Sequence, residues 1–573
     1  MRYLGVNNDN VILEVKNLSV AFGGRKVVEG LSYTLHRGET LGIVGESGSG
    51  KSVSSLAMIG LLPKQATVSG SALLDGKELL TLDENGFRNI RGRRISMVFQ
   101  EPMTSLNPSQ RCGEQVAEAL MLHEHVTRKE ARDKVLSLFE ETRLPRPEKI
   151  YRSYPHEISG GQKQRVMIAM ALICHPDVLI ADEPTTALDV TVQKSILDLF
   201  GDLQRRYGIA IIFISHDLGV IAQVSHRIAV MYKGSVVEQG SADEVLRNPK
   251  HPYTRGLLAC RPPLDSRPRR LPTVASFMEG EEAAESSAQH DEPQTNDIQS
   301  TITSVKAQAD ADVPLLRVRN LGVTYALKRS IMGKVKQQLK AVDGLSFDIW
   351  RGETLGLVGE SGCGKSTLGR ALLRLIDTSS GSVEYNGVRL DTLSRSAIRR
   401  FRPKLQIVFQ DPYSSLNPRL TIGQAIMEPL QNYSRGANDG ERRERVVSLM
   451  EQVGLKAEWF DRYPHEFSGG QRQRVCIARA LILEPELVVC DESVSALDVS
   501  VQAQVLNLLN DLKERYGFTY LFITHDLSVV HYMADRIMVM RNGKIVESGT
   551  PDELFSNPQT DYTRTLLAAI PRI

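Results

Sequence analysis

The chain has 573 residues, which is too long for a single hydrophobic core and predicts roughly two to four domains. Hydrophobic residues make up 41% and charged residues 24%, the proportions of an ordinary soluble globular protein. The 70 basic and 68 acidic residues give a net charge of only +2, so no overall field recruits nucleic acid or an anionic membrane.

The cysteines and the apolar runs set further limits. The six cysteines form no CxxC pair, so we expect reduced thiols in a reducing compartment and neither a zinc nor an iron–sulfur site. The N-terminal residues lack the apolar stretch of a secretory signal, and no apolar run approaches the roughly 18 to 20 residues that span a bilayer. We therefore expect a cytosolic chain that reaches a membrane only through a partner.

The first third of the chain begins with strands. Residues 11 to 43 alternate apolar and polar positions, which predicts antiparallel strands with one solvent-exposed face. The apolar run 40 to 44 predicts a buried strand, and GESGSGKS at 45 to 52 follows it and leads into a helix that ends near residue 62. A second apolar strand, 95 to 99, ends at Gln100, and residues 113 to 151 show helical periodicity.

Helices and apolar strands then alternate. The sequence SGGQ opens a helix that ends near residue 174, and the apolar strand 178 to 181 ends in Asp182 and Glu183. A helix over 192 to 207 leads to the apolar strand 210 to 214, which is followed by Ser215 and His216. This alternation indicates a largely parallel sheet covered on both faces.

The whole order then repeats. YPHEISGGQKQRVMIAMALI at 154 to 173 returns as YPHEFSGGQRQRVCIARALI at 463 to 482, and IIFISHDLGVI at 211 to 221 returns as YLFITHDLSVV at 520 to 530. So long a period indicates a duplicated domain. We expect α/β domains at 1–262 and 314–573, joined by an acidic and polar flexible linker at 263–313 that has few large apolar residues.

The second copy carries about eleven extra residues before its glycine-rich loop, around positions 327 to 340. This segment, LKRSIMGKVKQQLK, is basic. It is either a solvated hairpin or a contact for a partner or for lipid headgroups.

Two glycine-rich loops carry the clearest chemistry. Both match G-x4-G-K-[ST], in which backbone N–H groups and a lysine surround phosphates and a hydroxyl binds Mg²⁺. A glycine-rich turn without a ligand is the alternative, but two full matches between strand-like and helix-like segments favour nucleotide binding. The residues expected at the phosphates are Gly45, Glu46, Ser47, Gly48, Ser49, Gly50, Lys51, Ser52 and Val53, and Gly359, Glu360, Ser361, Gly362, Cys363, Gly364, Lys365, Ser366 and Thr367.

Carboxylates end a buried strand in each copy. Asp182 and Asp491 are placed to hold Mg²⁺ with Ser52 and Ser366, because the carboxyl ends of parallel strands meet beside such a loop. The adjacent glutamates, Glu183 and Glu492, can polarise the attacking water. One Asp-Glu pair alone would more often be solvated, but two matched pairs favour a site.

Amide and imidazole groups end two further strands. Gln100 and Gln410 can contact the metal or the water. His216 and His525 can donate to a γ-phosphate, although either histidine alone would more often be a structural cap.

A second phosphate-type element is the sequence SGGQ. A hydroxyl, two glycines and a helix start provide N–H donors and a positive dipole that suit a γ-phosphate, in either copy's own site or the other's. The residues are Ser159, Gly160, Gly161 and Gln162, and Ser468, Gly469, Gly470 and Gln471.

Together these motifs resemble the ATP-binding-cassette ATPases over essentially the whole chain apart from the linker. The matching motifs are Walker A, Q-loop, SGGQ signature, Walker B, catalytic glutamate and H-loop, as quoted above, with D-loops at Asp189 and Asp498. The resemblance implies P-loop NTPase cassettes with an antiparallel subdomain and a helical insertion, ATP and Mg²⁺ as cofactors, and adenine stacked on Phe22 and Tyr325. It also implies that the cassettes pair head to tail, each ATP lying between one Walker A and the other signature.

Within that family the chain resembles the ATPase subunits of peptide-type importers, including glutathione, nickel and microcin C-type members. The strings FQEPMTSLNP and FQDPYSSLNP, and NPKHPYTRGLL and NPQTDYTRTLL, carry this resemblance, together with GKSV against GKST. It implies ATP hydrolysis coupled to transport, two permease subunits and a solute-binding protein as separate chains, no nucleic acid partner, and peripheral attachment through the permeases at the cytoplasmic face of the inner or cell membrane.

A tandem ATPase that acts on the ribosome or on DNA without membrane partners is the alternative. The linker of such a translation factor is typically a basic helical arm, whereas the linker here is acidic, which disfavours binding to a phosphate backbone. A nucleotide-binding subunit without turnover is a third possibility, and the two glutamates argue against it.

Overall fold

The computed structural model describes residues 10–100, 105–186, 188–278, 313–329, 335–495 and 497–571. These fold into two compact units, the first formed mainly by residues up to 258 and the second mainly by residues 259 to 570. The acidic stretch 279–312, on which the linker prediction rests, lies outside the described residues. None of the helices in the described ranges is long and apolar enough to cross a membrane.

The small sheet of the first unit is antiparallel, as the alternating pattern predicted. Its strands are ordered β2-β1-β4-β5, and β1 pairs with both β2 and β4. Alternate residues of β1, such as Leu13 and Val15, are buried in the core. The strands are β1 (Val11–Phe22), β2 (Arg25–His36), β4 (Ala66–Leu74) and β5 (Lys77–Glu78).

The large sheet of the first unit has the order β10-β9-β3-β8-β7-β6 and is parallel except for β10. β3, β7 and β8 are buried throughout, which explains why their sequences are continuous apolar runs. The carboxyl ends of these three strands position the candidate site. The strands are β3 (Thr40–Val44), β6 (Ile95–Val98), β7 (Val178–Asp182), β8 (Ala210–Ser215), β9 (Arg227–Tyr232) and β10 (Ser235–Ser241).

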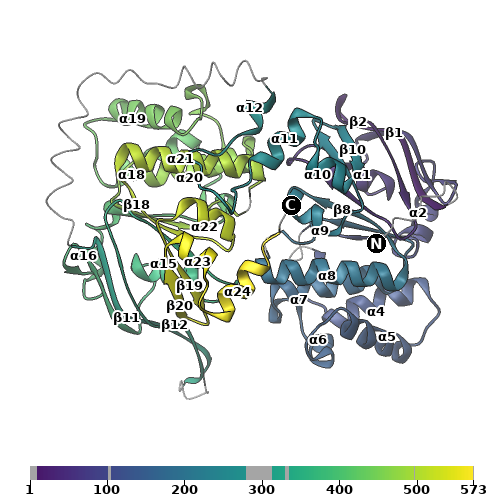
Figure 1. Cartoon of the computed structure of the whole chain (residues 1–573), viewed down its shortest axis with the longest axis horizontal. Coiled ribbons are helices and arrows are strands. Elements are labelled where there is room, and N and C mark those ends of the chain that lie inside the picture. Colours follow the sequence, from purple (N-terminus) through teal and green to yellow (C-terminus); the bar gives the residue numbers. More distant parts are fainter. Residues whose placement is uncertain are drawn as a thin grey trace. The chain divides into compact units, whose positions relative to one another are not determined.

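The helices of the first unit include a separate group, α4 to α7, whose members pack on one another (Figure 1). This group corresponds to the helical pattern predicted for residues 113 to 151 and to the helix that SGGQ opens. The helices are α1 (Lys51–Met58), α2 (Glu84–Ile90), α4 (Cys112–His123), α5 (Arg128–Glu141), α6 (Pro147–Arg152), η2 (Pro155–Glu157), α7 (Gly160–Leu172), α8 (Val190–Tyr207), α9 (Leu218–Val224), α10 (Ala242–Arg247) and α11 (Pro252–Ala259).

The second unit repeats this topology, which confirms the duplicated domain and the α/β fold class. Its sheets are β12-β11-β14-β15, which is antiparallel, and β16-β17-β18-β13-β19-β20, which is parallel except for β20. The strands are β11 (Leu316–Arg329), β12 (Val335–Ile349), β13 (Thr354–Val358), β14 (Ser380–Tyr385), β15 (Val388–Arg389), β16 (Leu405–Val408), β17 (Leu487–Asp491), β18 (Thr519–Ile523), β19 (Arg536–Arg541) and β20 (Lys544–Gly549).

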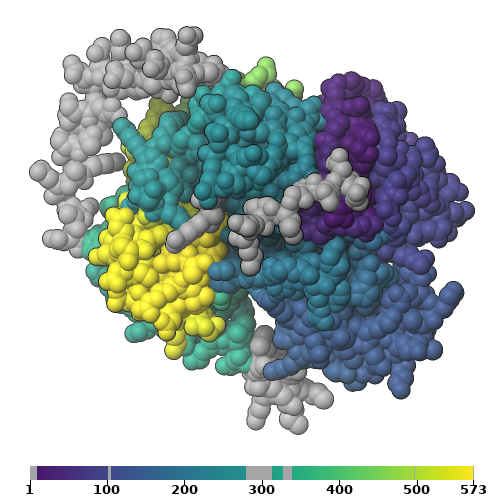
Figure 2. All heavy atoms as spheres, turned by 45° about the vertical axis from the view of Figure 1, so that its right-hand side comes forward, coloured from purple at the N-terminus to yellow at the C-terminus, as the bar shows by residue number. Residues whose placement is uncertain are grey.

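The helices of the second unit also follow the first. In Figure 1, α18, α19 and α20 lie together as the matching helical group, with α21 beside α20. The helices are α15 (Lys365–Leu372), α16 (Arg395–Ile398), η3 (Arg402–Lys404), α17 (Pro412–Ser415), α18 (Ile422–Asn432), α19 (Asp439–Gln452), η4 (Ala457–Trp459), η5 (Pro464–Glu466), α20 (Gly469–Leu481), α21 (Val499–Tyr516), α22 (Leu527–Met533), α23 (Pro551–Ser556) and α24 (Asp561–Ala568). Figure 2 shows the C-terminal residues of this unit, in yellow, as one continuous surface.

The extra basic segment of the second copy extends a hairpin. β11 and β12 remain paired as far as Arg329 and Val335. The turn, residues 330–334, lies outside the described residues. The backbone is therefore the hairpin of the first interpretation, and the contact with a partner or with lipid stays a prediction.

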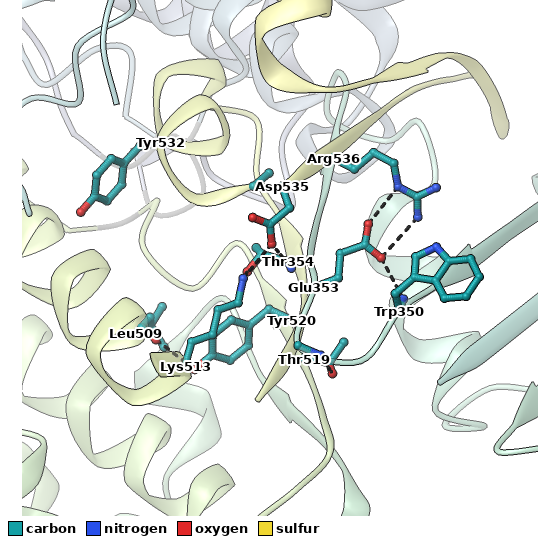
Figure 3. A network of polar contacts seen from close by, with 12 residues as sticks. Trp350, Glu353, Thr354, Leu509, Lys513, Thr519, Tyr520, Tyr532, Asp535 and Arg536 are labelled. Atoms are coloured by element: carbon teal, nitrogen blue, oxygen red, sulfur yellow. Dashed lines mark hydrogen bonds and ion pairs between the residues drawn. The ribbon is translucent and has the colours of Figure 1, made fainter. Parts of the chain in front are cut away.

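A polar network fixes the start of β13, the strand that precedes the second glycine-rich loop (Figure 3). The backbone N–H of Thr354 donates to Asp535 Oδ2 at 2.8 Å, and Lys513 Nζ donates to the same oxygen at 2.7 Å. Arg536 Nε donates to Glu353 Oε1 at 2.9 Å. These charge-assisted bonds hold β13 to β19 and α21 at the end of the sheet opposite the loop.

A second charged cluster centres on Glu486, which precedes β17. Lys404 Nζ and Arg351 Nη1 donate to its two carboxylate oxygens at 2.6 and 3.0 Å. Partial burial by itself raises the pKa of Glu486, but the hydrogen bonds from Lys404 and Arg351 and the nearby Tyr385 hydroxyl outweigh burial and lower the pKa to about 2.

Residues 259 to 278, most of which fall in the span expected to be a linker, pack against the second unit. We call this segment the strap; it ends in α12 (Val274–Met278). The Leu271 N–H donates to Asn507 Oδ1 at 2.9 Å, and Asn507 Nδ2 donates back to the Leu271 carbonyl at 2.8 Å. Arg267 Nη2 also donates to the carbonyl of Ala534, so the strap is held on α21 and beside α22.

Candidate functional site

The first glycine-rich loop connects the end of β3 to α1. Lys51 folds back over it and donates to the carbonyls of Gly45 at 2.6 Å and Glu46 at 2.9 Å. Gly50 has φ 96°, and a Cβ there would lie 3.0 Å from the carbonyl oxygen of Val27, so the turn into the helix requires glycine.

The second loop has the same geometry. Lys365 Nζ donates to the carbonyls of Gly359 at 2.7 Å and Glu360 at 3.0 Å. Both lysines are buried, at 5% and 4% exposure. Each cationic head is therefore fixed at the mouth of its loop.

The loop hydroxyl meets the strand-end aspartate in both copies. Ser52 Oγ donates to Asp182 Oδ1 at 3.0 Å, and Ser366 Oγ donates to Asp491 Oδ1 at 2.7 Å. Burial raises the pKa of Asp182 to about 6 despite the bond from Ser52, and burial raises the pKa of Asp491 as well. A cation beside these oxygens would remove that cost of burying negative charge.

Glu183 receives three donors on one oxygen. Gln100 Nε2 and Thr186 Oγ1 donate to Oε2 at 3.0 and 2.9 Å, and His216 Nδ1 lies 3.2 Å from the same atom. Burial by itself raises the pKa of Glu183, but the bond and charge of His216 and the charge of Lys51 lower it to about 2. Oε2 therefore has no room for a further hydrogen-bond donor, and the carboxylate is ionised at neutral pH.

Glu492 has a similar but not identical set of neighbours. Gln410 Nε2 donates to Oε2 at 2.8 Å, and His525 Nδ1 lies 3.4 Å from that atom. Lys365 Nζ lies 3.7 Å from Oε1. Burial raises the pKa of Glu492, and His525 and Lys365 outweigh burial and lower it. Ser495, the counterpart of Thr186, donates to the backbone carbonyl of Glu492 instead.

Both glutamates adopt left-handed backbone conformations, with φ 45° at Glu183 and 49° at Glu492. Such a conformation costs a residue other than glycine on the order of 1–3 kcal/mol and persists only where the surroundings impose it. The same strain at the same position of both copies points to a functional placement.

The signature residues are held in capping boxes rather than in these clusters. Ser159 N-caps α7 and Ser468 N-caps α20, each accepting from the backbone N–H of its glutamine, Gln162 or Gln471. A Cβ on Gly160 would meet no atom within 4 Å, so this end of α7 faces open space. The helix start can therefore accept an anion.

The remaining predicted residues lie apart from the glutamate clusters. Asp189 is buried and accepts from Thr191 Oγ1 at 2.7 Å. Asp498 N-caps α21. Phe22 packs partly against the first-unit core, whereas Tyr325 is 43% exposed. Adenine stacking on either ring stays a prediction.

Sequence reasoning missed two residues at the loops. Tyr253 accepts a hydrogen bond from the Glu46 N–H at 3.0 Å, and Tyr562 accepts one from the Glu360 N–H at 3.1 Å. Both tyrosines occur in the paired strings HPYTRGLL and TDYTRTLL. These strings indicated the subfamily, but they did not predict that the tyrosines contact the glycine-rich loops.

The donor set fits a magnesium–nucleotide complex. Hydroxyl and carboxylate oxygens converge at Ser52 and Asp182, and Mg²⁺ prefers oxygen ligands. A Cβ at Gly48 or Gly362 would meet no atom within 4 Å, so each loop has open space beside this glycine. Such a loop can surround a phosphate group.

Comparison with known proteins agrees with this geometry. The ABC transporter family matches residues 28–186 and 342–495, and the oligopeptide/dipeptide transporter C-terminal region matches 237–287 and 546–573. The glutathione import ATP-binding proteins GsiA of Escherichia coli O6:H1 and of E. coli K12 are each 48% identical over 98% of this chain and 89% of their own length.

A solved structure is also similar. CbiO1 from Clostridium perfringens, part of the ABC transporter complex CbiONQ, is 29% identical over 43% of this chain and 91% of its own, with a TM-score of 0.37. The sequence matches cover both repeats and almost the whole chain. The chain therefore belongs to the ABC transporter family, as an ATPase with two cassettes in one polypeptide.

Proposed function

We propose that this chain is the energy-coupling subunit of an importer for peptide-like solutes, such as dipeptides, oligopeptides, glutathione or related compounds. The observation that carries the proposal is 48% identity over 98% of the chain to a glutathione import ATP-binding protein. The peptide-transporter C-terminal region follows both cassettes, which supports the same assignment.

Each cassette binds ATP through its loop. The backbone N–H groups of residues 45–53 and 359–367 surround the phosphates, and Lys51 and Lys365 meet the outer phosphates. Mg²⁺ would be held by Ser52 and Asp182 in one copy and by Ser366 and Asp491 in the other, and Gln100 and Gln410 could contact the metal. Bound Mg²⁺ supplies positive charge to the phosphates during transfer.

Glu183 and Glu492 orient the attacking water. Because Glu183 Oε2 already accepts from Gln100, Thr186 and His216, we assign Oε1 to the water. As the water oxygen bonds to the γ-phosphorus, the bond from that phosphorus to the β–γ bridging oxygen breaks, and ADP leaves with the electron pair. The proton that the water gives up passes to the glutamate Oε1 and from there to phosphate or solvent. His216 and His525 donate to the departing γ-phosphoryl oxygens.

Hydrolysis drives motion when ATP binds the two cassettes more tightly in a closed pair than apart. In our proposal each ATP lies between the P-loop of one cassette and the signature of the other, so losing the γ-phosphate releases the pair. The conformational equilibrium shifts by no more than that difference in affinity. Two permease subunits and a solute-binding protein, as separate chains, complete the importer at the cytoplasmic face of the inner or cell membrane.

The ribosome- or DNA-associated alternative gains no support. The relatives reported above are import proteins by name, and both cassettes carry the peptide-transporter C-terminal region.

The test is to purify the complex from membranes, identify the co-purifying multi-span chains and reconstitute them in vesicles. We expect one peptide-like solute, presented with its binding protein, to raise ATPase activity severalfold and to accumulate on the receiving side. The variant Glu183→Gln/Glu492→Gln serves as the control without hydrolysis. Co-sedimentation with ribosomes that survives moderate salt, without any permease, would contradict the proposal.

A further inference from the structure

Each P-loop contacts the C-terminal region that follows its own cassette. The contact joins the backbone N–H of Glu46 to the hydroxyl of Tyr253 at 3.0 Å, across 207 positions of sequence. The second copy repeats it between Glu360 and Tyr562 at 3.1 Å. Both tyrosines lie in the segments that match the oligopeptide/dipeptide transporter C-terminal region.

The contact holds a single peptide plane at both of its ends. The carbonyl of Gly45 accepts from Lys51 Nζ at 2.6 Å, and the N–H of the same peptide unit, on Glu46, donates to Tyr253. Because the peptide unit is planar, fixing its N–H also fixes the direction of its carbonyl. The hydroxyl of Tyr253 therefore fixes the direction in which the Gly45 carbonyl points toward Lys51.

The second copy has the same two hydrogen bonds on its peptide plane, but its tyrosine ring packs against a different residue. Gly359 O accepts from Lys365 Nζ at 2.7 Å, while Tyr562 accepts from the neighbouring N–H. The ring of Tyr562 lies under the Arg541 guanidinium at 4.7 Å. In the first copy Tyr253 lies against Tyr232, with ring centroids 4.3 Å apart. The ring packing differs between the copies, but the hydroxyl contact does not.

A half-buried carboxylate anchors the tyrosine-bearing helix in each copy. Glu238, on β10, accepts from the N–H groups of Lys250 at 2.7 Å and His251 at 3.1 Å, just before α11. Glu547, on β20, accepts from the Gln559 and Thr560 N–H groups at 2.7 and 3.0 Å, just before α24.

The second anchor has additional donors. Thr563, next to Tyr562, donates its hydroxyl to Glu547 Oε2 at 2.6 Å. A continuous path of hydrogen bonds and helix backbone thus leads from β20 to the P-loop.

We infer that Tyr253 and Tyr562 are positioning residues that orient the P-loop lysine through the peptide plane at Glu46 and Glu360. The C-terminal region thereby adjusts the affinity of each site for the phosphates of ATP. This inference rests on the ATP-binding role of the two loops.

The test uses Tyr253→Phe and Tyr562→Phe in the full chain, because phenylalanine keeps the ring and removes only the hydroxyl. Loss of one neutral hydrogen bond predicts an increase in KM for ATP of about three- to tenfold at the altered site, with little change in kcat. Equilibrium ATP binding in the Glu183→Gln/Glu492→Gln background should weaken by the same factor.

Tyr232→Phe is the matched control, since it alters a ring of the same cluster and leaves the Tyr253 hydroxyl intact. Glu547→Gln gives a second route, because it loosens the helix anchor without changing Tyr562, and we expect a smaller increase in KM. A lower melting temperature with unchanged KM and ATP affinity in both tyrosine variants would overturn the inference.

A further variant distinguishes failure of this inference from failure of the proposed function. If Lys51→Ala/Lys365→Ala hydrolyses ATP as fast as the unaltered chain, the loops are not the ATP sites and the proposed function fails. If that variant is inactive while the tyrosine variants match the unaltered chain, the tyrosine inference alone is wrong.

Discussion

A buried amide makes two of the hydrogen bonds that hold the strap on the second unit. Asn507 is 3% exposed, and its side chain accepts from the Leu271 N–H and donates to the Leu271 carbonyl, at 2.9 and 2.8 Å. Its counterpart on α8 of the first cassette is Asp198, which is exposed. The copies differ at this position because only α21 carries the strap.

Replacing Asn507 by alanine removes both bonds to Leu271, and it also removes the bond that the Tyr532 hydroxyl donates to Asn507 Oδ1 at 3.1 Å. At a net value of about 1 kcal/mol each, the two bonds contribute about 2 kcal/mol to strap docking. Since 1.4 kcal/mol corresponds to a factor of ten, the opening equilibrium of the strap should rise about 30-fold. The sheet core of the second cassette should stay packed when the strap detaches, although α22 loses the bond from Tyr532 to Asn507.

Hydrogen exchange measures this opening directly. We expect the amide of Leu271, and peptides covering residues 264–275, to exchange about 30-fold faster in Asn507→Ala. Asp198→Ala is the matched control and should leave exchange of the strap unchanged. Equal protection of Leu271 in Asn507→Ala and in the unaltered chain would refute the assignment of Asn507 as the residue that holds the strap.

Three further outcomes follow from the sites and their surroundings. Glu183→Gln and Glu492→Gln, made separately, should each lower ATP turnover at least severalfold, and an unchanged rate in either variant would show that the two sites are not equivalent. Lys51→Ala/Lys365→Ala should abolish turnover and ATP-dependent association of the cassettes, as read by nucleotide binding and by cross-linking; full activity would contradict both loops as ATP sites. Glu486, whose folded pKa of about 2 lies below the ordinary value of 4.5, stabilises the fold above about pH 4.5 and loses that contribution as the pH falls toward 2. The melting temperature of Glu486→Gln should therefore lie below that of the unaltered chain at pH 7 and approach it below pH 4, and a constant difference would contradict this linkage.

Much of the fold was predictable because local pattern and topology agree. The apolar runs at 40–44, 178–181 and 210–214 became buried parallel strands, and most of the alternating stretch 11–43, up to His36, became an antiparallel pair. Parallel strands bring their carboxyl ends to one edge. The contact of Ser52 with Asp182 therefore followed from sequence, since both residues lie at that edge.

Other features of the structure had no signal in the sequence. The predicted length of α1 was wrong, since the helix ends at Met58 and not near residue 62. Thr186 was not expected to share Glu183 Oε2 with His216 and Gln100, because hydroxyl orientation depends on the turn after β7.

Residue types and their spacing were enough to predict the duplication, the order of the motifs and the side chains that gather at the sheet edge. The folded structure was needed to show that Tyr253 reaches the Glu46 N–H and that residues before α12 dock on Asn507. These contacts use backbone N–H and carbonyl groups, which every residue possesses. Their partners are therefore chosen by how helices pack on the sheet, and the identity of the residues does not reveal them.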